Sequence, residues 1–195
     1  MIKKISVLVL AGIGLAYCKS DEKQPAQAAT AETKALTKSE NTDSLSFSVS
    51  QILSSYYKLK ENFIQENDTA INSQAKQLAA LCTQIPLNKM KADELIISTA
   101  KTNAEGVVAE IQGMLSEKTI EDKRKGFYTI SEQIYDLIRT IQYDKEVIYH
   151  YKCDAAMGGN GAAWLSATKS TINPYLPKQK ILCADITDSL DFSKK

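Results

Sequence analysis

The side chains best suited to hold a metal ion lie close together near the end of the sequence. They are His150, Cys153, Met157 and Cys183, which supply one imidazole, two thiols and one thioether. Thiolate and thioether sulfur select Cu(I) or Ag(I), and imidazole joins such sites readily. The ring face of Trp164 could cover a soft cation. These residues predict a copper or silver site.

The backbone conformation decides whether His150 belongs to this site. On a helix, positions 150, 153 and 157 would share one face, whereas on a strand His150 and Cys153 point to opposite faces. Residues 146–153 (EVIYHYKC) are rich in Val, Ile and Tyr, which favours a strand. We therefore expect His150 to be the weakest member of the ligand set.

A structural disulfide between Cys153 and Cys183 is the alternative use of these sulfur atoms. Thiols oxidise outside the cytoplasm, and closing a loop of about thirty residues would stabilise the fold by roughly 3.6 kcal/mol. Trp164 would then pack on the bond, Met157 would fill the core, and His150 would be an exposed strand residue. A disulfide that opens to receive a metal ion would be compatible with both hypotheses.

The N-terminus has the pattern of a bacterial lipoprotein signal peptide, predicted at residues 1–17. Two lysines precede an apolar run, Ile5–Ala16, which is too short to span a bilayer. The run ends at Leu15-Ala16-Tyr17-Cys18, where Cys18 would receive the lipid, although Tyr17 departs from the usual small residue. A simple secretory signal is the alternative. No later apolar run is long enough for a transmembrane helix.

Residues 18–44 are predicted to form a lipidated N-terminus and a flexible tether, because the stretch 19–44 has no aromatic residue and only one Leu.

Residues 45–195 are predicted to form one all-α domain, an antiparallel four-helix bundle with an irregular C-terminal extension (146–195) and possible short strands in it. Apolar residues recur at helical spacing in four segments, of which the third begins near Lys91 and the fourth is opened by Thr119 or Glu121. The predicted stripes are Val49, Ile52, Tyr56, Leu59 and Phe63; Ile71, Ala75, Leu78, Cys82 and Ile85; Ala100, Ala104, Val107, Ile111 and Met114; and Phe127, Ile130, Ile134, Leu137 and Ile141.

Conventional catalysis and nucleic-acid binding are both disfavoured. The sequence has no Gly-x-Ser-x-Gly or His-Glu-x-x-His motif, and its glycines at 158, 159 and 161 are not followed by Gly-Lys-Ser/Thr. A Cys153–His150 nucleophile pair would lack an orienting third group. The 24 basic and 23 acidic residues are well mixed and give a net charge of +1, so there is no basic surface for a phosphate backbone. We expect neither an enzyme nor a nucleic-acid-binding protein.

Several short motifs follow the predicted strand: Tyr151-x-Cys153, Met157, Gly161-Ala162-Ala163-Trp164-Leu165-Ser166, Ile172-Asn173-Pro174-Tyr175 and Cys183. Together they resemble the bacterial family called "domain of unknown function 3347". That family has Cys-Pro-Met where this sequence has Cys153-Asp154-Ala155-Ala156-Met157, and Ala184 replaces a Gly that often follows the last Cys. Its members are typically exported, and some are fused to adaptors of heavy-metal efflux pumps. The resemblance therefore implies metal handling.

Two functional hypotheses follow from the sequence. The first is a lipid-anchored protein of the cell envelope that binds copper or silver as an accessory to metal efflux or resistance. The second is a non-catalytic interaction module of the envelope with a structural Cys153–Cys183 disulfide. In both, the membrane is reached through the lipid at Cys18, on the periplasmic or outer-membrane side or at the cell surface, and the protein partner is an efflux-pump adaptor or another envelope protein.

Overall fold

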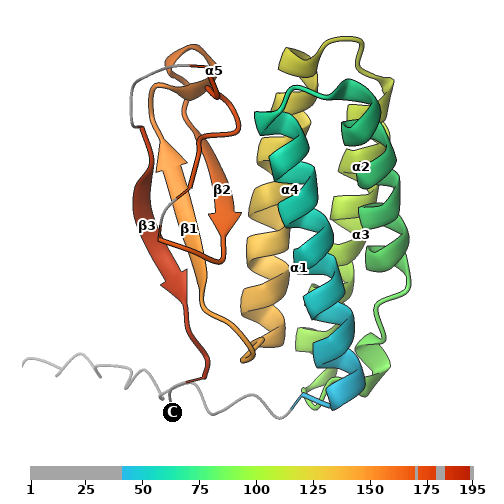
Figure 1. Cartoon of the computed structure of the whole chain (residues 1–195). Helices are drawn as coiled ribbons and strands as arrows, with labels where there is room; N and C mark the ends of the chain where they lie inside the picture. The colour runs from blue at the N-terminus through green and yellow to red at the C-terminus, as the bar shows by residue number, and fades with distance from the viewer. Residues whose placement is uncertain (1–40, 170, 179–182, 194–195) are drawn as a thin grey trace, which may run out of the picture. The chain divides into compact units, whose positions relative to one another are not determined.

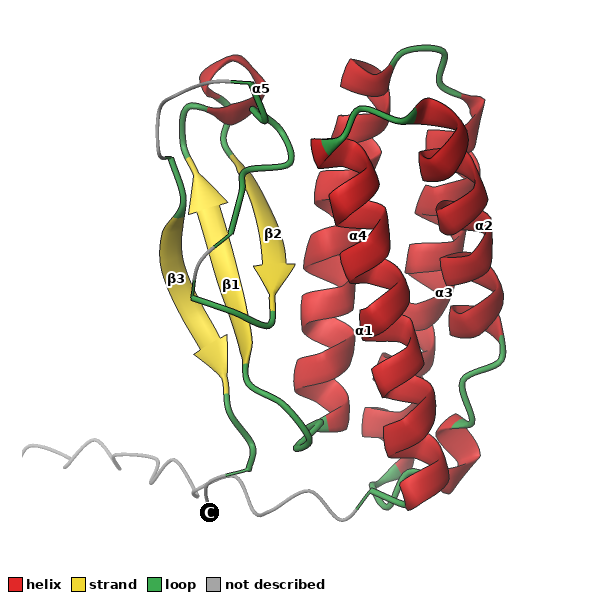
Figure 2. Cartoon of the chain, in the orientation of Figure 1, coloured by secondary structure: helices red, strands yellow, loops and turns green. Residues whose placement is uncertain are grey.

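Four long helices and a small antiparallel sheet make up the described part of the chain. The computed structural model describes residues 41–169, 171–178 and 183–193, so the predicted signal peptide and Cys18 lie outside the described residues. The helices pack beside one another, and the sheet forms a second layer next to them (Figures 1 and 2). The elements are α1 (Asp43–Ile64), α2 (Asp68–Thr83), η1 (Leu87–Lys89), α3 (Glu94–Ser116), α4 (Ile120–Ile141), β1 (Ile148–Cys153), α5 (Ala156–Gly159), β2 (Ala162–Ser166) and β3 (Asp185–Leu190).

Polar side chains fix where the long helices begin. In each case an oxygen of the capping side chain accepts a hydrogen bond from a backbone N–H in the first turn, which would otherwise lack a helical partner. The four capping residues are Thr42, Asn67, Asp93 and Thr119. The caps shift two predicted boundaries: α3 begins at Glu94 and not near Lys91, and α1 begins at Asp43, inside the segment predicted as tether.

The predicted apolar stripes form the core of the bundle. Nineteen of the twenty stripe residues are buried, and Ile85, just after the end of α2, is half-buried. Each helix packs against the next one along the chain, which confirms the predicted four-helix bundle. Among the described helices, none combines the length and the apolar character needed to cross a membrane.

Aromatic side chains fill the space between α1 and α4, the two sequence-distant neighbours in the bundle. The ring of Phe127 in α4 lies 5.4 Å from that of Tyr56 and 4.7 Å from that of Phe63. The ring of Tyr175, from the segment that follows β2, approaches Phe127 to 5.8 Å. The C-terminal segment therefore shares one aromatic core with the bundle.

The C-terminal extension is more regular than the sequence indicates. Its three strands are antiparallel in the order β2-β1-β3, which confirms the predicted strand around 146–153 and adds two others. Between β1 and β3 the register shifts: His150 pairs with Asp188 and Tyr151 with Ile186, so Thr187 has no direct partner on β1. Such a bulge accommodates one extra residue and re-aims neighbouring side chains.

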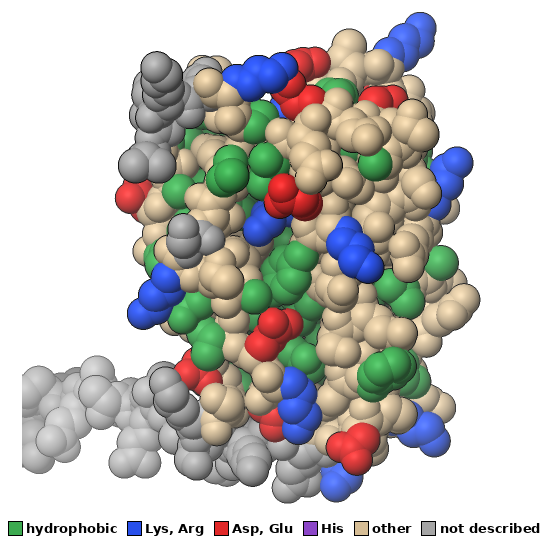
Figure 3. Space-filling model, viewed as in Figure 1, with side chains coloured by type: hydrophobic (Ala, Val, Ile, Leu, Met, Phe, Trp, Pro, Cys, Tyr) green, Lys and Arg blue, Asp and Glu red, His purple; other side chains and the backbone are tan. Residues whose placement is uncertain are grey.

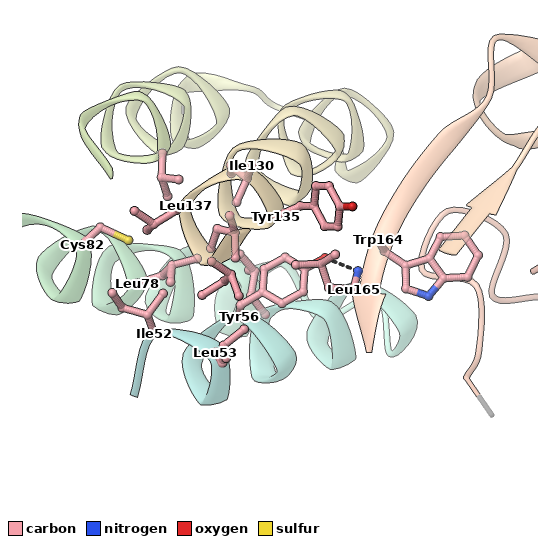
Figure 4. Close-up of a cluster of buried hydrophobic side chains, with 14 of the residues drawn as sticks. Ile52, Leu53, Tyr56, Leu78, Cys82, Ile130, Tyr135, Leu137, Trp164 and Leu165 are labelled. Carbon is pink, nitrogen blue, oxygen red and sulfur yellow. Dashed lines mark hydrogen bonds between the residues drawn. The ribbon is translucent and has the colours of Figure 1, made fainter. Parts of the chain in front are cut away.

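Two tyrosine hydroxyls bond to the backbone of β2. The backbone N–H of Leu165 donates to the Tyr56 hydroxyl at 2.9 Å, as Figure 4 shows, and the Tyr175 hydroxyl donates to the carbonyl of Ala163 at 2.7 Å. Because β2 is an edge strand, these bonds satisfy backbone groups that would otherwise remain unpaired inside the protein. One tyrosine from α1 and one from the C-terminal segment thus hold β2 in place.

Two adjacent tyrosines provide a matched test of this arrangement. Tyr56→Phe removes a buried hydroxyl that bonds Leu165 and, at 2.7 Å, the Ser131 hydroxyl; leaving a buried N–H unpaired should lower the free energy of unfolding by about 1–3 kcal/mol. The Tyr57 hydroxyl is also buried but has no hydrogen-bond partner in the described residues. Tyr57→Phe should therefore leave stability unchanged or raise it. Urea unfolding measures both, and equal losses would contradict this role for Tyr56.

Candidate functional site in the C-terminal sheet

The two C-terminal cysteines form a disulfide. Cys153 is the last residue of β1 and is fully buried, and Cys183 lies two residues before β3, with the two Cα atoms 5.1 Å apart. The side-chain amide of Asn173 donates to the carbonyl of Cys183 at 2.9 Å. The disulfide alternative from the sequence is thus confirmed, and the bond links the end of β1 to the segment that leads into β3.

His150 lies on the opposite face of the sheet from Cys153, as the strand prediction requires. Its Nε2 is 2.8 Å from Glu132 Oε1 on α4, and its Nδ1 is 2.6 Å from the hydroxyl of Thr187. The Tyr135 ring approaches the imidazole to 4.7 Å, and the His150 side chain is only 13% exposed. The prediction of an exposed strand residue is wrong, because α4 covers this face of the sheet.

A further hydrogen bond between side chains, close to His150, connects α4 to β3. The hydroxyl of Tyr135 donates to the carboxylate of Asp188, and this bond holds the pKa of Asp188 below its usual value. Burial, together with the nearby Asp188, raises the pKa of Tyr135 to about 12. The polar groups around His150 are thus paired with one another across the interface between helix and sheet.

Met157 lies in the turn between β1 and β2. Its backbone is in the left-handed region (φ 52°), as are Gly158, Gly159 and Gly161, and the N–H of Gly161 bonds the carbonyl of Ala156 at 3.1 Å. Glycine adopts positive φ without steric cost, which explains why glycines are dense here. The Met157 side chain is half-buried against the core, in agreement with the core-filling alternative.

Trp164 packs on the same face of the sheet as Cys153. Its ring stacks on that of Tyr151, with centroids 5.4 Å apart and planes 14° from parallel, and the residue is 0% exposed. Figure 4 shows Trp164 pointing away from the helices, while the neighbouring Leu165 points toward Tyr56. Tyr151 therefore covers one of the two ring faces that could otherwise have met a cation.

The structure does not assemble the predicted set of soft-metal ligands. The sulfur atoms of Cys153 and Cys183 are bonded to each other, and both ring nitrogens of His150 have protein partners on the other face of the sheet. Within the described ranges, no group of three or more His, Cys, Asp or Glu side chains is placed to hold a metal ion. In the oxidised fold, therefore, Cys153 and Cys183 are not available as thiolate ligands.

The remaining described cysteine, Cys82, is the core residue that the sequence predicts. It is 2% exposed and forms no disulfide. Burial raises the pKa of its thiol to about 12, so almost none of the reactive thiolate forms at neutral pH.

Arg124 fastens the C-terminal segment to the bundle, a role that the sequence analysis missed. Its Nε donates to the carbonyl of Pro174 at 2.9 Å, and its Nη2 contacts the carbonyl of Phe63 and the carboxylate of Glu66 at 3.2 and 3.3 Å. The signal was present: Arg124 precedes Phe127 by three residues and so falls on the apolar face of its helix. A charged residue on that face needs a buried partner.

Together, the fold and the site define a small helical-bundle protein with a disulfide-linked antiparallel sheet docked on one side. The family model described as "Protein of unknown function (DUF3347)" matches residues 52–146, and this match supports the resemblance to that family. The match runs from α1 to the segment before β1 and so ends before the disulfide. Neither the comparison with curated proteins nor that with solved structures found a match.

Proposed function

We propose that this protein is a non-catalytic accessory module of the cell envelope, anchored by a lipid at Cys18 and stabilised by the Cys153–Cys183 disulfide. The disulfide is the main support for this proposal, because it uses the two sulfur atoms that a soft-metal site would need. Disulfides also form and persist in oxidising compartments such as the cell envelope. The partners of His150 support the non-catalytic part, since Glu132 and Thr187 hold both ring nitrogens in a largely buried position.

The family resemblance supports an envelope protein as the binding partner. Some members are fused to adaptors of heavy-metal efflux pumps, so we take such an adaptor, or another envelope protein, as the partner of this chain. The membrane would be reached through the lipid, on the periplasmic or outer-membrane side.

Binding of Cu(I) or Ag(I) to the reduced protein is a second candidate function. The observation in its favour is that the fold already holds Cys153 and Cys183 side by side, with Met157 in the turn that follows Cys153. A dithiol reductant would break the S–S bond, itself becoming a disulfide, and would leave two thiols. On binding a soft cation, these thiols would release their protons to the solvent and hold the cation as thiolates. His150 would take no part, because it lies on the opposite face.

One experiment separates the two functions. Protein is isolated from its own envelope with free thiols blocked, and a non-reducing peptide map is expected to show Cys153 linked to Cys183. A Cu(I) titration against a competing chelator is then run on oxidised and reduced protein, with Cys153→Ser and Met157→Leu variants. If the disulfide is purely structural, neither the oxidised nor the reduced protein should compete with the chelator for Cu(I).

The outcomes are distinct. Free thiols at both positions in the isolated protein would overturn the structural disulfide. Cu(I) binding by the reduced protein that falls at least about tenfold in each variant would establish the second function. Binding that neither substitution alters would exclude this site.

A further inference from the structure

Lys60 is a buried cation at the junction between α1 and the C-terminal segment. The residue is only 9% exposed. Its Nζ lies 3.4 Å from the hydroxyl of Thr171 and 5.7 Å from the centre of the Tyr57 ring. On the face drawn in Figure 3, apolar side chains reach the surface along this boundary between the bundle and the sheet.

No carboxylate neutralises Lys60 among the residues that the structure describes. The other buried cations of the bundle differ: Lys123 contacts Asp68 at 2.5 Å, and Arg124 contacts Glu66 at 3.3 Å. Buried charges in proteins are as a rule paired, because removing an ion from water without compensation costs several kcal/mol. Burial accordingly lowers the pKa of Lys60, with Glu61 opposing the shift only in part.

Two neutral donors accompany this cation. The indole N–H of Trp164 donates to the same Thr171 hydroxyl that Lys60 contacts, also at 3.4 Å. The Thr171 hydroxyl in turn donates to the carbonyl of Ile172, also at 3.4 Å. All three contacts are longer than the usual 2.7–3.2 Å, so the two groups that donate to Thr171 and the Thr171 hydroxyl itself are only weakly satisfied. One positive charge and two weakly bonded polar hydrogens, those of the Trp164 indole and the Thr171 hydroxyl, are thus gathered around Thr171.

We propose that Lys60, Thr171 and Trp164 form a binding site for a carboxylate group. A carboxylate supplies the single negative charge that Lys60 lacks and two oxygens that can accept from the neutral donors. A phosphate dianion would leave excess negative charge beside the half-buried Tyr57 ring and the buried Trp164 ring, which makes it a poorer match. The site goes beyond the envelope role proposed above and does not depend on the state of the disulfide.

Trp164 makes the proposal directly measurable, because it is the only tryptophan in the sequence. The purified full chain, labelled with ¹⁵N, gives one indole N–H resonance. Acetate is titrated at constant ionic strength, with chloride making up the balance. We expect a saturable shift of this resonance, and in Lys60→Met an affinity at least about tenfold weaker, as expected for the loss of a hydrogen bond to a charged group.

Lys58→Met is the matched control, since Lys58 is an exposed lysine two residues away on the same helix. It should bind acetate as the wild type does, which separates a local site from the general effect of charge. A wild-type resonance that does not respond to acetate would overturn the proposal without reference to any variant. So would equal weakening in both lysine variants, or a response to inorganic phosphate as strong as that to acetate.

Discussion

Replacing both Cys153 and Cys183 with serine is expected to lower the free energy of unfolding by about 3.6 kcal/mol, the largest loss of any change considered for this chain. The two residues are 30 positions apart, and the estimate comes from the loop-closure entropy that the crosslink removes from the unfolded chain. The midpoint of urea denaturation measures the loss. Hydrogen exchange should quicken first in β1 and β3, because the disulfide lies between them.

Cys82 supplies the control for this experiment. Cys82→Ala removes a buried thiol and leaves the disulfide intact, so a reductant should still destabilise that variant as much as the wild type. The same reductant should have no effect on the double serine variant. Unchanged stability of the double variant would show that the bundle holds the sheet without the crosslink, and would remove the structural reason for the disulfide.

The bundle could be predicted from the sequence because its signals are local. Each helix carries an apolar residue every three or four positions, and polar caps stand at their starts. The cap at Asn67 was visible as an interruption between two stripes, and Thr119 as an opening residue. The sequence places the start of α3 too early because Lys91 and Ala92 are acceptable helix residues. The helix start is marked by the hydrogen bond that the Asp93 carboxylate accepts from the backbone N–H of Ile96.

The sheet could be predicted only in part, because its order depends on distant residues. Residues 146–153 carry the Val, Ile and Tyr content typical of a strand. In contrast, β3 has the sequence Asp-Ile-Thr-Asp-Ser-Leu, and only its last residue is buried. It has no apolar alternation, and it is held by pairing with β1 and by the bond between Tyr135 and Asp188. The burial of His150 likewise depends on Glu132, eighteen residues away in α4.

The same dependence on distant partners makes Arg124→Met the second large expected effect, a loss of about 3 kcal/mol in the free energy of unfolding. The substitution preserves an apolar chain of similar length but leaves the buried carbonyls of Pro174 and Phe63 without their charged donor. Hydrogen bonds to charged groups contribute about 1.5–3 kcal/mol each, and Lys178 still pairs with Glu66. Urea unfolding gives the total, and limited proteolysis should show earlier cleavage around 171–178.

Lys125→Met is the control, because Lys125 adjoins Arg124 and has the shorter ion pair. Its Nζ is 2.6 Å from Asp122, but its side chain is 67% exposed, and exposed pairs contribute about 0–1 kcal/mol. If short ion pairs determined stability, the Lys125 variant would lose more. We expect the opposite, since the Arg124 contacts are buried and bind two segments that are distant in sequence. Equal small losses would mean that the aromatic contacts of Tyr175 alone hold the C-terminal segment on the bundle.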